Sequence, residues 1–294
     1  MESIRLARGG AEAEIQTRGA QIASYIAPSG TEIIWQAYPD VWAQHSPVLF
    51  PVCGSVTGGK IRIAGKTWPI EKHGFAMDQD FRIVRKGEDF AELALEPSER
   101  SRCQYPFEFL FHVIYSMTDR GFRTTFMVGN PGNDRMPFCV GGHPGFVCPL
   151  EEDAEYTDYD LIFPEKEDGW NALVMDDGRL GGGEILECLR DRGVIPLDHR
   201  LFDEKDTLVL THITSRSVKL VSRKTGKGLK LGFPDMEVLA VWSMPGAGAD
   251  YVCLEPWHGI PDTLDATGNF EDKPFVTILE PGDAWHGSFE VELI

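Results

Sequence analysis

The chain has 294 residues, of which 42% are hydrophobic and 11% aromatic; this is enough apolar material for a real core and excludes a disordered protein. Its 46 acidic and 28 basic residues give a formal net charge of −18, which would repel nucleic-acid phosphates, anionic membranes and, less strongly, a phosphorylated substrate. We therefore expect no nucleic acid and no membrane as partner, and a neutral small molecule as ligand.

Short runs with strand character recur along the whole chain, separated by turn sequences such as Pro-Ser-Gly, Asn-Pro-Gly-Asn and Thr-Gly-Lys-Gly. In the first half these runs cover 3–16, 19–28, 32–36, 59–70, 81–96, 109–117 and 121–130. In the second half they cover 159–163, 206–213, 217–223, 229–233, 237–244, 251–256, 275–283 and 285–294.

Helical periodicity is scarce between the runs, which excludes a doubly wound α/β sheet and predicts an all-β fold, a large antiparallel sandwich or a barrel. No repeat, low-complexity segment or linker divides the chain, so we expect a single domain over residues 1–294. The polar segment 176–206 is interpreted as a long surface excursion.

The six cysteines are scattered without a C-x-x-C pair, which argues against a disulfide framework in a chain of this length. The N-terminal sequence "MESIRLARGG" has no apolar region of the signal-peptide type, and no run reaches transmembrane length. These features favour a reduced, soluble, cytoplasmic protein.

Three of the eight histidines stand beside glycine, proline and aromatic residues, the mixture expected where a rigid scaffold presents polar groups next to apolar walls. They are His73 in "EKHGFAM", His143 in "VGGHPGF" and His258 in "EPWHGIPD". At the second of these the glycine pair admits unusual backbone angles, and the following proline restricts the histidine. Each could also be an ordinary packed or surface side chain.

Glu255 follows the apolar run "YVCL", so it is expected near the end of a buried strand that Pro256 and Trp257 terminate. A carboxylate in such a place must be paired or have a raised pKa, and a raised pKa suits a general base. The alternative is a glutamate that caps turn amides.

Other chemistries have less support in the sequence. No H-E-x-x-H or G-x-S-x-G motif is present and no cysteine adjoins a candidate base, so we expect no metal and no covalent nucleophile. What remains is acid–base chemistry beside aromatic walls. Phe75, Phe146, Trp242 and Trp257 could stack on a flat ligand face such as that of a pyranose, or belong to the core, which is the preferred interpretation for Trp242.

Four blocks carry a family resemblance: "LFPVCGSVTGGKIRIAGKTWPIEKHGFAMDQDF", "VGGHPGFVCPL", "LFDEKDTLVL" and "YVCLEPWHGIPD". In this order, followed by "VTILEPGDAWHGSFEVEL", they resemble the aldose 1-epimerase (galactose mutarotase) superfamily, and most closely its bacterial LacX-like branch. The resemblance implies a twisted antiparallel β-sandwich (the galactose mutarotase-like supersandwich) with an open carbohydrate cleft. It also implies an isomerase that interconverts the α and β anomers of a free sugar without a cofactor, as a monomer or homodimer.

The resemblance also implies roles for individual residues. Glu255 would take the proton of the C1 hydroxyl, a protonated His143 would give one to the ring oxygen, and His73 would orient the sugar. Asp206, or its neighbour Asp203, would bind sugar hydroxyls, with Ser55, Phe75, Phe146 and Trp257 as further substrate-binding candidates.

One position departs from the family pattern. Ser55 stands after the "FPVCG" turn, where the family commonly carries an arginine that contacts the sugar, and a hydroxyl cannot form the same planar fork. Arg62 or Lys60 on the following strand could compensate.

Two other functions remain open at this stage. A hexose-6-phosphate 1-epimerase would need a cationic pocket for the phosphate. A non-catalytic carbohydrate-binding module could use the same fold, because fold does not fix function. A glycoside hydrolase has less support, since no second carboxylate stands out as a partner of Glu255.

Overall fold

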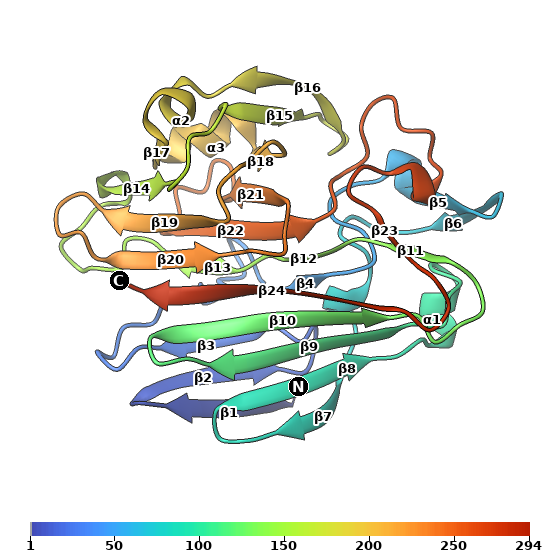
Figure 1. Ribbon diagram of the computed structural model, residues 1–294. Coiled ribbons are helices and arrows are strands. Elements are labelled where there is room, and N and C mark those ends of the chain that lie inside the picture. The colour runs from blue at the N-terminus through green and yellow to red at the C-terminus, as the bar shows by residue number, and fades with distance from the viewer. Residues whose placement is uncertain (1) are drawn as a thin grey trace.

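The computed structural model describes residues 2–294 (Figure 1). The strands of the first half are β1 (Ser3–Arg8), β2 (Ala11–Gln16), β3 (Ile22–Ile26), β4 (Val48–Leu49), β5 (Lys60–Ile63), β6 (Lys66–Pro69), β7 (Arg82–Lys86), β8 (Phe90–Leu95), β9 (Leu110–Met117), β10 (Gly121–Gly129), β11 (Met136–Phe138), β12 (Val140–Gly142) and β13 (Gly145–Val147). Those of the second half are β14 (Tyr159–Ile162), β15 (Trp170–Val174), β16 (Leu180–Ile185), β17 (Val194–Pro196), β18 (Thr207–Leu210), β19 (Ser217–Ser222), β20 (Gly228–Gly232), β21 (Val238–Trp242), β22 (Tyr251–His258), β23 (Thr277–Leu279) and β24 (Ala284–Leu293). The α-helices are α1 (Glu99–Arg102), α2 (Glu187–Arg192) and α3 (His199–Lys205), and the 3₁₀ turns are η1 (Thr57–Gly59), η2 (Ala76–Asp78), η3 (Tyr156–Asp158) and η4 (Phe270–Asp272).

Two large antiparallel sheets form the body of the molecule. One has nine strands in the order β17-β14-β19-β20-β24-β10-β9-β8-β7. The other has eight, in the order β16-β15-β18-β21-β22-β12-β4, with β13 also paired to β22. Three smaller sheets, β1-β2-β3, β5-β6 and β11-β23, complete the fold, and α2 and α3 lie beside β15–β18 (Figure 1). The predicted large, twisted antiparallel β-sandwich is confirmed.

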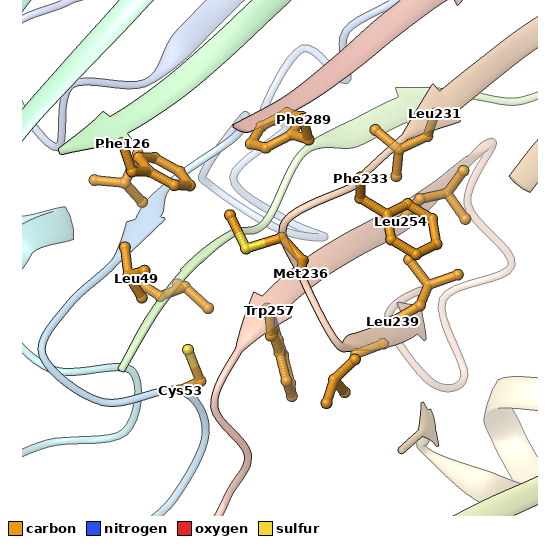
Figure 2. Close-up of a cluster of buried hydrophobic side chains, with 14 of the residues drawn as sticks. Leu49, Cys53, Phe126, Leu231, Phe233, Met236, Leu239, Leu254, Trp257 and Phe289 are labelled. Carbon is orange, nitrogen blue, oxygen red and sulfur yellow. The ribbon is translucent and has the colours of Figure 1, made fainter. Parts of the chain in front are cut away.

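The core lies between the two large sheets. Strand β9 shows why the chain folds this way, because its residues alternate between buried and half-buried along all eight positions. Figure 2 shows a part of this core to which both sheets contribute. Its labelled members are Leu49, Cys53, Phe126, Leu231, Phe233, Met236, Leu239, Leu254, Trp257 and Phe289.

Two sequence-based expectations differ from the structure in detail. Residues 32–36 do not form a strand but only isolated bridges, of Glu32 with Ile26 and of Ile34 with Phe146. Segment 176–206 is mostly exposed or half-buried, as expected of a surface excursion, but it is more regular than its composition suggests, since it contains β16, α2, β17 and α3. The first of its helices ends on Gly193 at φ 65°, a left-handed cap that explains part of its glycine content.

All six cysteines are free thiols, and four of them are buried. None of the helices formed by the described residues is long and apolar enough to cross a membrane.

Candidate active site

A cavity of about 290 Å³ opens at the face of the eight-stranded sheet. Glu255 and Trp257 of β22, His143 of the β12–β13 corner and His73 of the loop before η2 all line it. The three titratable residues singled out in the sequence as catalytic are thus brought together, although nearly two hundred residues separate the first from the last.

Glu255 projects from the middle of a strand. The sequence suggested that Pro256 and Trp257 end this strand, but β22 continues to His258, with Glu255 opposite Ala240 and Trp257 opposite Val238 in β21. Pro256 lies where β22 faces the gap between β12, which pairs with it up to Trp257, and β13, which pairs with it up to Cys253, so no ladder partner on that side needs its missing N–H. Only 1% of Glu255 is exposed, so the sheet holds this carboxyl in a fixed, dry place.

The corner that holds His143 is set by close packing. Gly141 and Gly142 belong to β12 and do not have positive φ angles, so the expected unusual backbone angles are not the reason for them. A Cβ on Gly141 would lie 2.6 Å from Trp257 Cδ1, and one on Gly142 would lie 2.7 Å from Phe289 Cε1. Only glycine lets β12 approach these two rings so closely. This packing fixes the position of the strand end, and therefore of His143, which follows it directly.

His73 is oriented by a backbone amide. The Gly54 N–H donates to His73 Nδ1 over 3.1 Å, so in the neutral ring the proton is on Nε2. His73 itself has a φ of 68°, and a Cβ on the following Gly74 would lie 2.2 Å from the Phe50 carbonyl oxygen. The imidazole is therefore held at a strained, tightly packed turn, a feature that clusters at functional sites.

A network behind His73 fixes the loop that supplies this amide. Asp262 Oδ2 accepts hydrogen bonds from Thr57 N (2.8 Å) and Thr57 Oγ1 (2.9 Å), and Asp262 N donates to the Ser55 carbonyl over 2.8 Å. Lys273 Nζ donates to Asp262 Oδ1 over 2.6 Å, and both side chains of this ion pair are about 95% buried. Loop 54–57 is thereby tied to the wall of the cavity.

His143 and Glu255 are in direct contact. Their closest atoms, His143 Nε2 and Glu255 Oε2, are 3.2 Å apart, and both side chains are almost fully buried. Burial raises the pKa of Glu255 well above its usual value, with Asp206 adding to the rise and Lys72 opposing it. Burial lowers the pKa of His143 to about 3. Both shifts favour a protonated carboxyl and a neutral imidazole.

The family resemblance implies a protonated His143 as the acid, whereas burial favours a neutral ring in the free protein. The pKa of His73 is also well below its usual value. Burial is the main cause, and repulsion from a positive charge on His143 or Lys72 lowers it further. The exchangeable proton of the resting site is therefore on Glu255.

Tryptophan rings form the apolar walls. Trp42, Trp242 and Trp257 line the cavity, and the rings of Trp42 and Trp242 lie 4.9 and 5.6 Å from that of His143. Trp242, interpreted from sequence as core, is half-buried and lines the site. Glu255 Oε2 and Trp257 Nε1 are both buried and have no partner in strict hydrogen-bond geometry among the described residues, although Trp257 is close enough to oppose the rise in the pKa of Glu255.

A sequence model of the family described as aldose 1-epimerase matches residues 2–292. The chain belongs to this family. Protein LacX of Lactococcus lactis subsp. lactis, in its plasmid and its chromosomal form, is 32% identical over 288 residues, which cover 96% of each chain.

Solved structures agree with this family membership. A galactose mutarotase related enzyme from Lactobacillus acidophilus is 28% identical with a TM-score of 0.94, covering 100% of this chain and 97% of that one. A galactose mutarotase-like protein from Lactobacillus casei is 26% identical with a TM-score of 0.91, covering 100% of both chains. The resemblance inferred from the sequence blocks is confirmed.

Several residues suggested by the aldose 1-epimerase resemblance lie outside the cavity lining. Phe75 packs against Phe50, Tyr105 and Phe109 in the core, and its ring is 3% exposed. Phe146 is fully buried on β13 and pairs with β22. The direction of these rings follows from their strands and turns, which the motif letters alone do not specify.

Ser55 and Asp206 lie beside the site instead of in it. Ser55 faces the turn at Gly178, where an added Cβ would lie 2.3 Å from its Oγ. Asp206 is exposed at the end of α3 with a φ of 59°, next to Thr207, which does line the cavity. The alternative, Asp203, accepts a hydrogen bond from Gly246 N and is thus engaged elsewhere.

His258 belongs to a separate polar group. Its Nδ1 lies 2.6 Å from Glu237 Oε2 and its Nε2 lies 2.5 Å from Thr277 Oγ1, and its ring stacks on Trp285. This histidine ties β22 to β23 and does not line the cavity.

Sequence reasoning missed Lys72 and Trp42. Lys72 immediately precedes His73 and lines the cavity. Arg62 and Lys60, which were expected to compensate for the arginine missing at Ser55, lie on β5 outside the lining, and Arg62 donates to the Thr267 carbonyl. Its position next to His73 in the "EKHGF" motif is the one sequence feature that could have identified Lys72. Trp42 lies in the irregular segment 36–47, which has no periodicity that predicts where its ring points.

One cluster has the composition of a metal site. Potential ligand atoms of His143, Cys253 and Glu255 lie within 4.8 Å of one another. Metals bind the thiolate, but burial raises the pKa of the Cys253 thiol well above its usual value, and nearby Glu255 raises it further. In the metal-free protein the thiol therefore stays protonated.

Proposed function

We propose that this member of the aldose 1-epimerase family is an active epimerase that interconverts the α and β anomers of a free sugar. Glu255 and His143 are the proton-transferring pair, and His73 orients the sugar oxygens. The observation that carries the proposal is the 3.2 Å contact between His143 and Glu255 inside a cavity of about 290 Å³.

The cavity has the chemistry that a pyranose requires. The three tryptophan rings offer apolar surfaces to the C–H faces of a sugar, as aromatic linings do in small-molecule sites. The Glu255 carboxyl and the imidazoles of His73 and His143, which line the same cavity, supply hydrogen-bond donors and acceptors for sugar hydroxyls.

The reaction needs one proton accepted and one proton donated. Glu255 takes the proton of the C1 hydroxyl, the electrons of that O–H bond form the C1 carbonyl, and the C1–O5 bond breaks. His143 gives a proton to O5. Rotation about the C1–C2 bond presents the other face of the aldehyde, and ring closure reverses both transfers. Each transfer contributes about 10²–10⁴-fold to the rate.

In the free protein the proton is on Glu255, whereas the reaction needs an ionised Glu255 and a protonated His143; substrate binding can bring about this change. A sugar hydroxyl that donates to the Glu255 carboxyl stabilises the carboxylate and lowers its pKa. The proton can then cross the 3.2 Å gap to His143, which becomes the acid while Glu255 becomes the base. The pair holds one proton throughout.

The phosphorylated-sugar alternative finds less support. A phosphate site normally uses arginine forks or several cations. Within residues 2–294, Lys72 is the one lysine or arginine that lines the cavity, and the carboxylate of Asp206 lies near enough to raise the pKa of Glu255. The local charge therefore favours a neutral sugar.

Anomer exchange tests the proposal directly. We expect the protein to accelerate mutarotation of freshly dissolved α-D-glucose or α-D-galactose, followed by polarimetry and by NMR exchange between the anomeric signals. Glu255→Gln and His143→Ala should each lower kcat by about 10²–10⁴-fold while the circular dichroism spectrum is unchanged.

His112→Ala is the matched control. This histidine lies on β9 in the other large sheet, where its Nδ1 is 2.7 Å from Glu92 Oε1, and it should keep full activity. The proposal fails if the wild-type protein matches buffer across a panel of aldoses. Calorimetric sugar binding without exchange would identify a non-catalytic carbohydrate-binding protein instead.

A further inference from the structure

A second hollow, of about 570 Å³, adjoins the catalytic cavity. Lys72 lines both spaces. At two more places the linings are chain neighbours: Gly54 and Gly178 line the cavity, while Ser55 and Asp177 line the hollow. The close approach of Gly178 to Ser55 Oγ forms the ridge between the two spaces. A ligand that passes Lys72 can therefore occupy both.

The lining of this hollow, which we name the outer hollow, combines polar and apolar residues. Its polar side chains are those of Ser55, Glu71, Lys72, Gln104 and Asp177. Among the described residues, the side chains of Glu71, Lys72 and Gln104 make no hydrogen bond or ion pair with another side chain. They are thus available to a ligand with several hydroxyls.

The charges of the outer hollow balance. Arg179 Nε donates to Asp177 Oδ2 over 2.8 Å, and this hydrogen bond lowers the pKa of Asp177, so the two form a neutral pair. Glu71 and Lys72 are adjacent in the chain and opposite in charge. No arginine is among the residues that line the hollow in the described part of the chain, so a phosphate would find no guanidinium fork in its lining. A neutral, polyhydroxylated group fits better.

We infer that the outer hollow is a second sugar subsite, and that the substrate of this protein is the reducing end of a disaccharide or longer saccharide. The reducing unit lies on the tryptophan walls beside Glu255 and His143, and the next unit extends past Lys72 to Glu71 and Gln104. This inference rests on the proposed function, because the same cavity must bind the reducing sugar.

The test compares sugars and variants. Exchange rates at the reducing-end anomeric signals would be measured by NMR for glucose and galactose and for maltose, cellobiose, lactose and melibiose, with wild-type protein and with Glu71→Ala/Gln104→Ala. We expect at least one disaccharide to have a higher kcat/KM than its reducing monosaccharide. The double variant should lose about three- to tenfold in kcat/KM for that disaccharide and nothing for the monosaccharide.

Glu88→Ala is the control, because Glu88 is exposed on the β7–β8 turn, away from both spaces. Equal kcat/KM of wild type and double variant on every disaccharide would overturn the inference, as would exchange of monosaccharides alone. If no sugar shows anomer exchange, the proposed function fails, and the second subsite is then tested by calorimetry alone. Tighter binding of a disaccharide than of its reducing monosaccharide, lost in the double variant, would still support the second subsite. Equal binding of the two sugars would overturn it.

Discussion

Replacing Asp262 with alanine should destabilise the protein strongly, because this carboxylate neutralises a buried lysine. Lys273 and Asp262 are 4% and 5% exposed, and Thr57 donates two further hydrogen bonds to the same carboxylate. Removing one partner of a buried ion pair leaves an uncompensated charge, at a cost of about 3–5 kcal/mol. We expect a loss of this size in the free energy of unfolding at pH 7, measured by urea denaturation.

The pH dependence of this loss follows from the pKa of Asp262. Burial alone would raise that pKa, but the charge of Lys273 and the hydrogen bonds from Lys273 and Thr57 outweigh burial and lower it below its usual value. A lowered pKa in the folded state contributes stability that is complete above the unfolded pKa of about 3.9. That contribution disappears as the pH falls through the folded pKa, so the difference between wild type and variant should shrink below pH 4.

Two further variants make the reasoning refutable. Asp262→Ala/Lys273→Met removes the stranded charge and should recover part of the loss, whereas the exposed Asp265→Asn should stay within about 0.5 kcal/mol of wild type. A loss below about 1 kcal/mol for Asp262→Ala, or a double variant less stable than the single one, would show that the buried charge does not decide the energetics of this region.

Three more predictions concern the site. Because burial lowers the pKa of His143 to about 3, its ring should remain neutral at pH 5, and ¹⁵N NMR shifts that titrate near pH 6.5 would contradict this. Gly141→Ala should lower the free energy of unfolding in urea by about 1–3 kcal/mol, since the new Cβ would lie 2.6 Å from Trp257 Cδ1. Gly129→Ala should leave it unchanged, because the nearest atom to a Cβ at that position is 3.6 Å away. Equal losses for the two variants would refute the packing argument. Trp42→Ala should raise the KM for the sugar about tenfold with little change in kcat, because an apolar platform binds the ground state and the transition state equally well. Tyr38→Ala is the control, since Tyr38 lies outside the cavity lining, and it should leave both constants unchanged. A fall in kcat alone would refute the platform role of Trp42.

The sequence predicts the long strands well, because alternation is a local signal. β9 and β10 fall within the predicted runs, and both alternate between the core and the outer face along most of their length. The strands that were missed are short or unpatterned. β4 has two residues, β12 and β13 have three each, and β16 carries three consecutive glycines, so each depends on its sheet neighbours for its conformation.

The proposed catalytic residues could be selected from the sequence because each has a local mark. Glycine and proline surround His143 and His73, and Glu255 interrupts an apolar run. The walls have no such mark. Trp42 reaches the cavity from an irregular segment, while Phe75, one of the flagged aromatics, turns into the core. Which ring faces a ligand depends on packing between segments distant in the chain, and no window of the sequence contains that information.

Burial does more here than exclude water. It moves the pKa of Glu255 up and that of His143 down, so that the free protein stores one proton on the carboxyl and carries no net charge at the pair. On the surface, an ordinary glutamate would be ionised at pH 7 without any ligand. In this cavity the pair is neutral without a ligand, so under the proposed function a sugar hydroxyl that donates to the Glu255 carboxyl would favour transfer of the proton to His143. Acid and base would then be generated together when the substrate is in place, which would link proton transfer to binding.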